Sequence, residues 1–199
     1  KYRSRPHKVS IHEMASQVQE AMGDENFVQL GGAVLSPELL PMKMIMRAAR
    51  TAVNSSMATS LSYSHSTGLS DLRRQIANKM IGVTGSITTE EIIITNGCTD
   101  AVTLCLRAVT KPGDIIAIES PTFFGFLRLL EDLKLKALEV PTHPIEGIDL
   151  EYLETALKKH SIKALLIVPN ISNPLGYAMP DKNKYMLVKM LHQYDIPII

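Results

Sequence analysis

The sequence predicts an α/β protein with a three-layer α-β-α arrangement and a mostly parallel sheet. From residue 91 onward, short apolar runs alternate with amphipathic stretches, and turn signals such as Lys111-Pro112-Gly113-Asp114 separate them. We expect strands at 91–95, 115–118, 137–140, 164–168 and from 196, and helices from 97 and at 124–133, 149–159 and 181–194. Because helices connect consecutive strands, we expect right-handed crossovers and a sheet that helices cover on both faces.

The amino-terminal part is predicted to be helical. Apolar residues at helical spacing over 9–22 indicate a first helix, and Pro41 suits the first position of a second one. The methionines after Pro41 are more typical of core packing than of a cofactor site. Residues 58–67 are too polar and aperiodic for a regular element, and Ser70 is expected to be the N-cap of a third helix.

The predicted organisation has three parts. Residues 1–8 are interpreted as the remnant of a linker, because they carry the basic cluster Lys1, Arg3, Arg5, His7 and Lys8. Residues 9–57 form an amino-terminal helical segment, and 58–199 form the first part of a larger domain. The sequence ends at 195–199, in what reads as the start of a strand, so we expect the remainder of this domain outside the sequence.

Composition excludes several classes of protein. The 199 residues are 45% hydrophobic with a net charge of +1, which fits a globular core and gives no general attraction to nucleic acid. The histidines show no metal-ligand spacing, and Cys98 and Cys105 fit neither a zinc site nor a redox motif. We therefore expect no metal, no membrane span, reduced thiols and a cytoplasmic protein.

A glycine connects the first expected strand directly to a helix. Gly97 allows close backbone approach, and the N–H groups of Cys98 and Thr99 at the helix start suit a phosphate. The alternative is a plain capped helix. The usual nucleotide-binding signatures, GxGxxG and the Walker loop, are absent.

Two further segments follow expected strands. Phe123 and Phe124 place one ring where it can stack on a planar ligand and one where it can join the core. After 164–168, Pro174 restricts how Asn173 presents its amide, although the segment could also be an ordinary connection. Because ligands bind at the carboxyl ends of strands in such sheets, the three segments together predict a flat, phosphorylated heteroaromatic ligand.

These motifs resemble a known family. The motifs are Tyr63 followed five residues later by Gly68, Thr95-Asn96-Gly97-Cys98, Pro112-Gly113-Asp114, Glu119-Ser120-Pro121-Thr122-Phe123 and Ser172-Asn173-Pro174-Leu175-Gly176. Together they resemble fold-type I, class I/II pyridoxal-phosphate aminotransferases. They are most similar to the aminotransferase-like domain of MocR-type transcription regulators of the GntR family. The resemblance covers nearly the whole chain, which it identifies as a truncated large domain of that fold.

The resemblance implies a pyridoxal 5'-phosphate site. Gly97, Cys98 and Thr99 match the phosphate-binding turn, Phe123 matches the aromatic residue that stacks on the pyridine ring, and Asn173 matches the amide that binds the ring hydroxyl.

It also implies a homodimer, because Tyr63 matches a tyrosine that reaches the phosphate of the neighbouring subunit. Cis peptide bonds are expected before Pro121 and Pro174. Gly31 or Gly32 corresponds to the segment that passes near the substrate.

Three expected residues are missing from the sequence. The aspartate for the pyridine nitrogen, the Schiff-base lysine and the carboxylate-binding arginine of the family would follow residue 199. The resemblance therefore assigns no catalytic residue here, and we expect this fragment alone to be inactive and without cofactor.

Three functions remain open. The first is part of a regulator that senses pyridoxal phosphate with an amino-acid or amine effector and binds DNA through an absent winged helix, and the basic start favours it. The second is a fragment of a free-standing class I aminotransferase. The third, a generic nucleotide-binding α/β domain, is disfavoured because the glycine fingerprint is missing.

Overall fold

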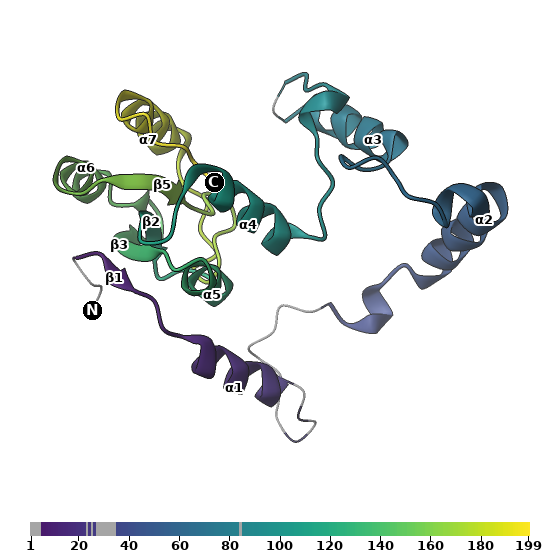
Figure 1. The fold of residues 1–199 in the computed structure, drawn as a ribbon, viewed down its shortest axis with the longest axis horizontal. Helices are drawn as coiled ribbons and strands as arrows, with labels where there is room; N and C mark the ends of the chain where they lie inside the picture. Colours follow the sequence, from purple (N-terminus) through teal and green to yellow (C-terminus); the bar gives the residue numbers. More distant parts are fainter. Residues whose placement is uncertain (1–4, 23, 25, 27–34, 84) are drawn as a thin grey trace. The chain divides into compact units, whose positions relative to one another are not determined.

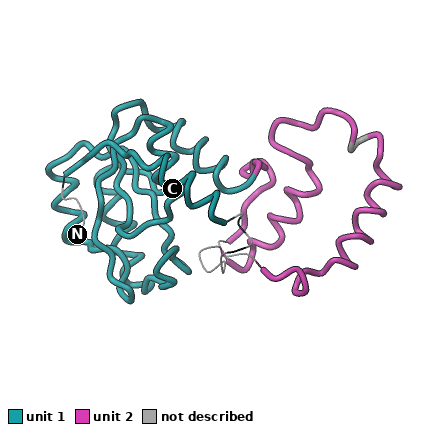
Figure 2. The backbone as a smooth tube through the Cα atoms, turned by 90° about the horizontal axis from the view of Figure 1, so that it is seen from below, with its two compact units in different colours: residues 1–27, 97–199 teal, residues 28–96 magenta. Residues whose placement is uncertain are grey.

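The computed structural model describes residues 5–22, 24, 26, 35–83 and 85–199 (Figure 1). The chain divides into two compact units, which are coloured separately in Figure 2. Unit 1 comprises residues 1–27 and 97–199, and unit 2 comprises residues 28–96.

Unit 1 is built on a mixed, mostly parallel sheet. Its strands run in the order β1 (His7–Lys8), β3 (Lys136–His143), β2 (Ile115–Ser120) and β5 (Ile162–Leu166), and β4 (Gly147–Ile148) pairs with the end of β3. Strand β2 is parallel to both β3 and β5, whereas β1 is antiparallel to β3. Beyond β5, Ile198 forms a parallel bridge with Leu165, as expected for a strand beginning near 196.

Helices cover both faces of this sheet, which confirms the predicted three layers. Alternate residues of β2 enter two different cores, because side chains along a strand point to opposite faces. Ile116 and Ile118 share one core with residues of α4 (Cys98–Val109) and α5 (Phe124–Asp132). Ala117 shares the other with residues of α6 (Leu150–Lys159) and α7 (Asp181–Gln193).

The first helix is fastened to the same unit. Helix α1 (His12–Met22) follows β1 and packs against α5. The Glu131 carboxylate on α5 accepts hydrogen bonds from the backbone N–H groups of Ile11 and His12, at 2.8 and 3.0 Å. This interaction satisfies N–H groups that the helix itself leaves without partners at its start.

Unit 2 consists of helices and short turns. It contains η1 (Pro37–Leu39), α2 (Met42–Ser60), α3 (Ser70–Met80) and η2 (Thr89–Glu91). The Arg73 guanidinium donates to the Thr89 carbonyl at 2.6 Å, and Thr88 and Glu91 form a capping box. These contacts join α3 to η2.

Several predicted elements need correction. Residues 92–95 form no strand, and residue 91 belongs to η2. Ile92 is buried but Ile93 is 63% exposed, and no strand pairs with this segment among the described residues. Apolar β-branched residues favour a strand only where a neighbouring strand is available.

The polar stretch predicted to be irregular from residue 58 begins inside α2, which continues to Ser60 with a kink at Ser56. The hydroxyls of Thr51 and Ser55 donate to backbone carbonyls one turn earlier, so polar composition here is compatible with a helix. Ser70 is the first residue of α3, and Leu69 occupies the N-cap. At the amino terminus, the basic residues His7 and Lys8 form edge strand β1.

None of the helices in the described part of the chain combines the length and apolar composition that a membrane crossing requires. The same residues contain no cluster of three or more side chains suited to a metal ion.

Candidate functional site

Three of the predicted segments lie at one edge of the unit 1 sheet, the carboxyl edge. Because β2 and β5 are parallel, the segments that follow Ser120 and Leu166 leave from the same edge. Only a short turn connects the end of α4 at Val109 to the start of β2 at Ile115. Helix α4 therefore runs in the direction opposite to β2, and its first turn lies at the carboxyl edge as well. The fold therefore gathers the Gly97 turn, Phe123 and the Asn173 loop on one side of unit 1.

The Gly97 turn opens α4. Gly97 has φ 94° and ψ 177°, a conformation that is essentially restricted to glycine. Cys98 and Thr99 are exposed in the first turn, where N–H groups have no partner within the helix. An exposed helix start of this kind can bind a phosphate through its N–H groups and its dipole.

The Phe123 ring follows the cis peptide bond between Ser120 and Pro121, which confirms that prediction. The ring is partly buried and meets the Phe126 ring edge-on at 5.5 Å. A Cβ atom on Gly125 would lie 2.3 Å from Phe123 Cε1, so the ring lies directly against the glycine backbone. Gly125 thus makes room for Phe123, and Phe126 rather than Phe124 is the ring buried in the core.

Asn173 sits on a tightly closed loop. Its peptide bond to Pro174 is cis, as predicted. The Ser172 N–H donates to the Tyr177 carbonyl at 2.9 Å, and the Gly176 N–H donates to the Ser172 carbonyl at 2.5 Å. Asn173 itself is exposed, and its amide makes no hydrogen bond with the described residues. The loop therefore presents an available amide on a fixed backbone.

A buried glutamate, which the sequence analysis did not single out, anchors this loop. Glu119 lies near the end of β2 and is 1% exposed. Its carboxylate accepts hydrogen bonds from the Val168 N–H at 2.8 Å and from the Tyr177 hydroxyl. One carboxylate thus holds both ends of the Asn173 loop. The signal in the sequence was a charged residue in an otherwise apolar strand.

The surroundings of Glu119 shift two pKa values. Burial raises the pKa of the Glu119 carboxyl, and hydrogen bonds from Tyr177 and Val168 oppose this effect only in part. Burial, together with the neighbouring carboxylate, raises the pKa of the Tyr177 hydroxyl. Ser172 lies close enough to lower both pKa values, yet its buried hydroxyl has no partner of good hydrogen-bond geometry among the described residues.

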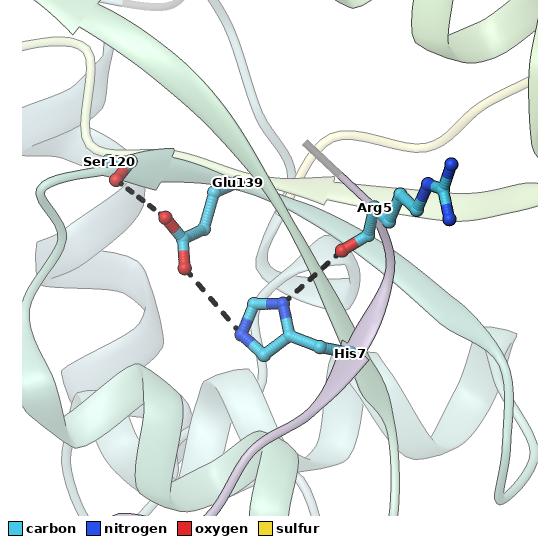
Figure 3. Close-up of polar contacts among 4 residues, drawn as sticks. All are labelled: Arg5, His7, Ser120 and Glu139. Carbon is cyan, nitrogen blue, oxygen red and sulfur yellow. Dashed lines mark hydrogen bonds and ion pairs between the residues drawn. The ribbon is translucent and has the colours of Figure 1, made fainter. Parts of the chain in front are cut away.

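A second carboxylate, Glu139, organises the edge strand (Figure 3). Glu139 accepts a hydrogen bond from the Ser120 hydroxyl at 3.1 Å, and its other oxygen lies 3.5 Å from His7 Nε2. His7 Nδ1 also lies 3.4 Å from the Arg5 carbonyl oxygen. These contacts tie β1 to β3 and support the residue that precedes Pro121.

Two predicted contributions come from residues outside unit 1. Tyr63 belongs to unit 2 and is fully exposed, so its role at the phosphate stays a prediction. Gly31 and Gly32 lie outside the described residues.

Comparisons with known proteins agree with the geometry. Residues 32–199 match the family described as aminotransferase class I and II. The chain is 37% identical over 194 residues to the HTH-type transcriptional regulator YjiR of Escherichia coli, covering 98% of this chain and 41% of that protein. It is 36% identical over 198 residues to the regulator YdcR of the same organism, covering 98% and 42%. The chain thus spans about two fifths of these curated relatives.

A solved structure shows the same fold. It is LysN, an α-aminoadipate aminotransferase from Thermus thermophilus, in complex with N-(5'-phosphopyridoxyl)-L-leucine. The TM-score is 0.77 at 26% identity, over 84% of this chain and 41% of that one. The chain therefore has the fold of fold-type I pyridoxal-phosphate aminotransferases, as part of a larger domain.

Proposed function

Because the chain belongs to the class I and II aminotransferase family, we propose that it forms part of a pyridoxal-phosphate-binding, effector-sensing domain in a GntR/MocR-type transcription regulator. The full-length protein then binds DNA through a winged helix outside this sequence. It works as a cytoplasmic homodimer whose effector is an amino acid or amine. The Schiff-base lysine also lies outside this sequence.

The residues at the carboxyl edge fit the cofactor. The exposed helix start at Gly97, Cys98 and Thr99 would hold the phosphate, and Phe123 would lie against the pyridine ring. The available amide of Asn173 would bind the ring hydroxyl. When bound, pyridoxal phosphate supplies an electron sink for amine chemistry. The residues of this chain contribute orientation, and Glu119 fixes the loop that carries the amide.

The observation that favours a regulator is the pattern of similarity. The chain is 37% and 36% identical to two proteins named as transcriptional regulators, over 98% of its length in each case. Its identity to the aromatic-amino-acid aminotransferase 1 of Thermococcus litoralis is 26% over 93% of the chain. A regulatory role for the whole protein accounts for this difference better than a purely metabolic one.

The alternative is a fragment of a free-standing class I aminotransferase. The likeness to LysN supports it, because that protein is an aminotransferase with a phosphopyridoxyl ligand. Both functions use the same site, so they differ in what the bound amine changes. In a regulator it changes affinity for DNA, and in an enzyme it is converted to product.

The test uses the full-length protein and the DNA upstream of its own gene. We expect binding in a mobility-shift assay, and we expect the affinity to change at least severalfold when pyridoxal phosphate and an amine effector from a panel are added. The Phe123→Leu variant should lose this response and keep basal DNA binding. A protein that binds no DNA and converts an amino acid with a 2-oxo acid over many turnovers would establish the alternative instead.

A further inference from the structure

The opposite edge of the unit 1 sheet, where its parallel strands begin, holds a basic hollow that the proposed cofactor site does not use. It has a volume of about 820 Å³. Its basic side chains come from β1, β3 and α6 or the residues beside them, namely Arg5, Lys8, Lys136, Lys159 and His160. Among the residues that the structure describes, no aspartate or glutamate lines it.

The arrangement of two lysines at this edge is costly. Lys8 on β1 and Lys136 on β3 are direct cross-strand partners in the antiparallel pair. Residues at such positions have Cβ atoms about 5 Å apart, and like charges there repel. Neither lysine forms an ion pair within the described residues. An anion between them would remove this repulsion.

The sheet register places both lysines on the face that α6 covers. Lys136 is also the register partner of Ile115 on β2, and Ile115 packs against the core that includes Leu153 and Ala156 of α6. Since register partners share a face, Lys8, Lys136 and Ile115 form one row under the carboxyl-terminal half of α6. The hollow therefore combines an apolar floor with cationic walls.

Two of the other basic groups, Lys159 and His7, have partial explanations of their own. Lys159 lies in the last turn of α6, where a cation interacts favourably with the helix dipole. His7 lines the same region, but its ring is directed to Glu139 on the other strand (Figure 3). The pair formed by Lys8 and Lys136 has no such explanation, and it carries the inference.

We propose that the basic hollow binds a small organic molecule with one or more phosphate groups. Phosphate accepts several charge-assisted hydrogen bonds from lysine and arginine, and the apolar floor suits the organic part. The volume falls within the range of roughly 300–1,000 Å³ that small-molecule sites occupy. A hollow of this size between β1 and α6 suits a compact ligand rather than a double helix.

Inorganic pyrophosphate is the probe for the phosphate part. We would titrate it by calorimetry into the full-length protein saturated with pyridoxal phosphate, so that the candidate cofactor site is filled. The double variant Lys8→Gln/Lys136→Gln should weaken pyrophosphate binding about tenfold or more, because it removes two charge-assisted contacts. The matched control Lys182→Gln/Lys189→Gln, which changes exposed lysines of α7, should bind like the wild type.

The outcomes separate this proposal from the cofactor proposal. Equal affinity for pyrophosphate in the wild type and the Lys8→Gln/Lys136→Gln variant would overturn the hollow as a phosphate site. A variant that loses affinity for a short DNA duplex but keeps its affinity for pyrophosphate would overturn it as well. The thermal midpoint without ligand should be at least as high in the Lys8→Gln/Lys136→Gln variant, which shows that it folds. Pyrophosphate should raise the midpoint of this variant less than that of the wild type and the control. A protein that takes up no pyridoxal phosphate still gives a valid result, because the comparison is between lysine variants.

Discussion

The two edges of the unit 1 sheet are built on different physical principles. At the carboxyl edge, a buried carboxylate fixes a loop, a glycine shapes the start of a helix, and an aromatic ring lies against a second glycine. At the opposite edge, where the parallel strands begin and which we call the amino edge, Lys8 and Lys136 are cross-strand partners and form no ion pair within the described residues. We propose that the first edge selects its ligand by holding groups in place, and that the second attracts a ligand by charge. Substitutions at the first should therefore cost stability, whereas those at the second should not.

The largest effect is expected at Glu119. Glu119→Ala leaves the Val168 N–H and the Tyr177 hydroxyl without their shared acceptor, so it should lower the free energy of unfolding by roughly 2–4 kcal/mol. Urea denaturation measures this value. Glu154→Ala, which removes an exposed pair with Lys158 on α6, should stay close to wild type. Equal losses in the two variants would refute the anchoring role of Glu119.

The pH dependence of the unfolding free energy should also reveal the burial of the Glu119 carboxyl. Because the folded-state pKa of this carboxyl is raised, the folded protein retains a proton that the unfolded chain has already released. Its contribution is therefore complete below the ordinary pKa of 4.5 and is lost as pH rises through the raised folded value. Glu119→Gln should flatten the unfolding free energy across that window. A stability profile that the substitution leaves unchanged would contradict the raised pKa.

The next largest effect on stability is expected from a substitution at Gly97. Gly97→Ala forces a side chain into a backbone region open mainly to glycine, so it should cost about 1–3 kcal/mol or reshape the helix start. Weaker binding of pyridoxal phosphate should accompany this loss. Gly82→Ala is the control. A Cβ atom meets no neighbour within 4 Å at either position, but only Gly97 has a positive φ. Cofactor binding that survives Gly97→Ala at full strength would place the phosphate elsewhere.

A smaller effect is expected at Gly125. A methyl group at this position displaces the Phe123 ring, so Gly125→Ala should weaken pyridoxal-phosphate binding severalfold, because an aromatic stacking contact is worth about 0.5–1.5 kcal/mol. Fluorescence titration would measure it. Phe123→Leu should reproduce the loss, and adding Gly125→Ala to it should weaken binding little further. Additive losses would mean that Gly125 acts independently of the ring.

The smallest effect belongs to the amino edge. Lys8→Gln removes one of two facing charges, so at low salt it should raise the free energy of unfolding by a few tenths of a kcal/mol. Added salt should abolish the difference, because it screens exposed charges. A loss of stability instead would give Lys8 a structural role and weaken the contrast between the edges.

The sequence predicted those features of the fold and the candidate site that depend on residues close together in the chain. The helix predicted at 149–159 is α6, which begins one residue later. Its start was predictable because the cap involves only neighbouring residues: the Asp149 side chain accepts a hydrogen bond from the Tyr152 N–H. The strands β2, β3 and β5 were predicted because each is an apolar run between turn signals. The Gly97, Phe123 and Asn173 segments followed from strand order, since each lies where a strand ends or a helix begins.

Contacts between distant residues were harder to predict. Ile92–Ile94 resembles a strand in composition, but pairing depends on a neighbour that the local sequence does not specify. The contact between Glu119 and Tyr177 joins residues 58 positions apart, so only the folded chain shows it. For the same reason, the basic cluster at the amino terminus was interpreted as a linker remnant, although His7 and Lys8 pair with β3 as an edge strand.

The central claim is that the carboxyl edge of unit 1 holds pyridoxal phosphate, and a titration of the full-length protein followed by absorbance tests it most directly. We expect saturable binding of one cofactor per chain, weakened severalfold by Asn173→Ala and by Phe123→Leu and unchanged by Lys136→Gln at the opposite edge. If both the Asn173→Ala and Phe123→Leu variants bind pyridoxal phosphate as tightly as the wild type, or if the wild type does not bind it, the carboxyl edge is not the cofactor site.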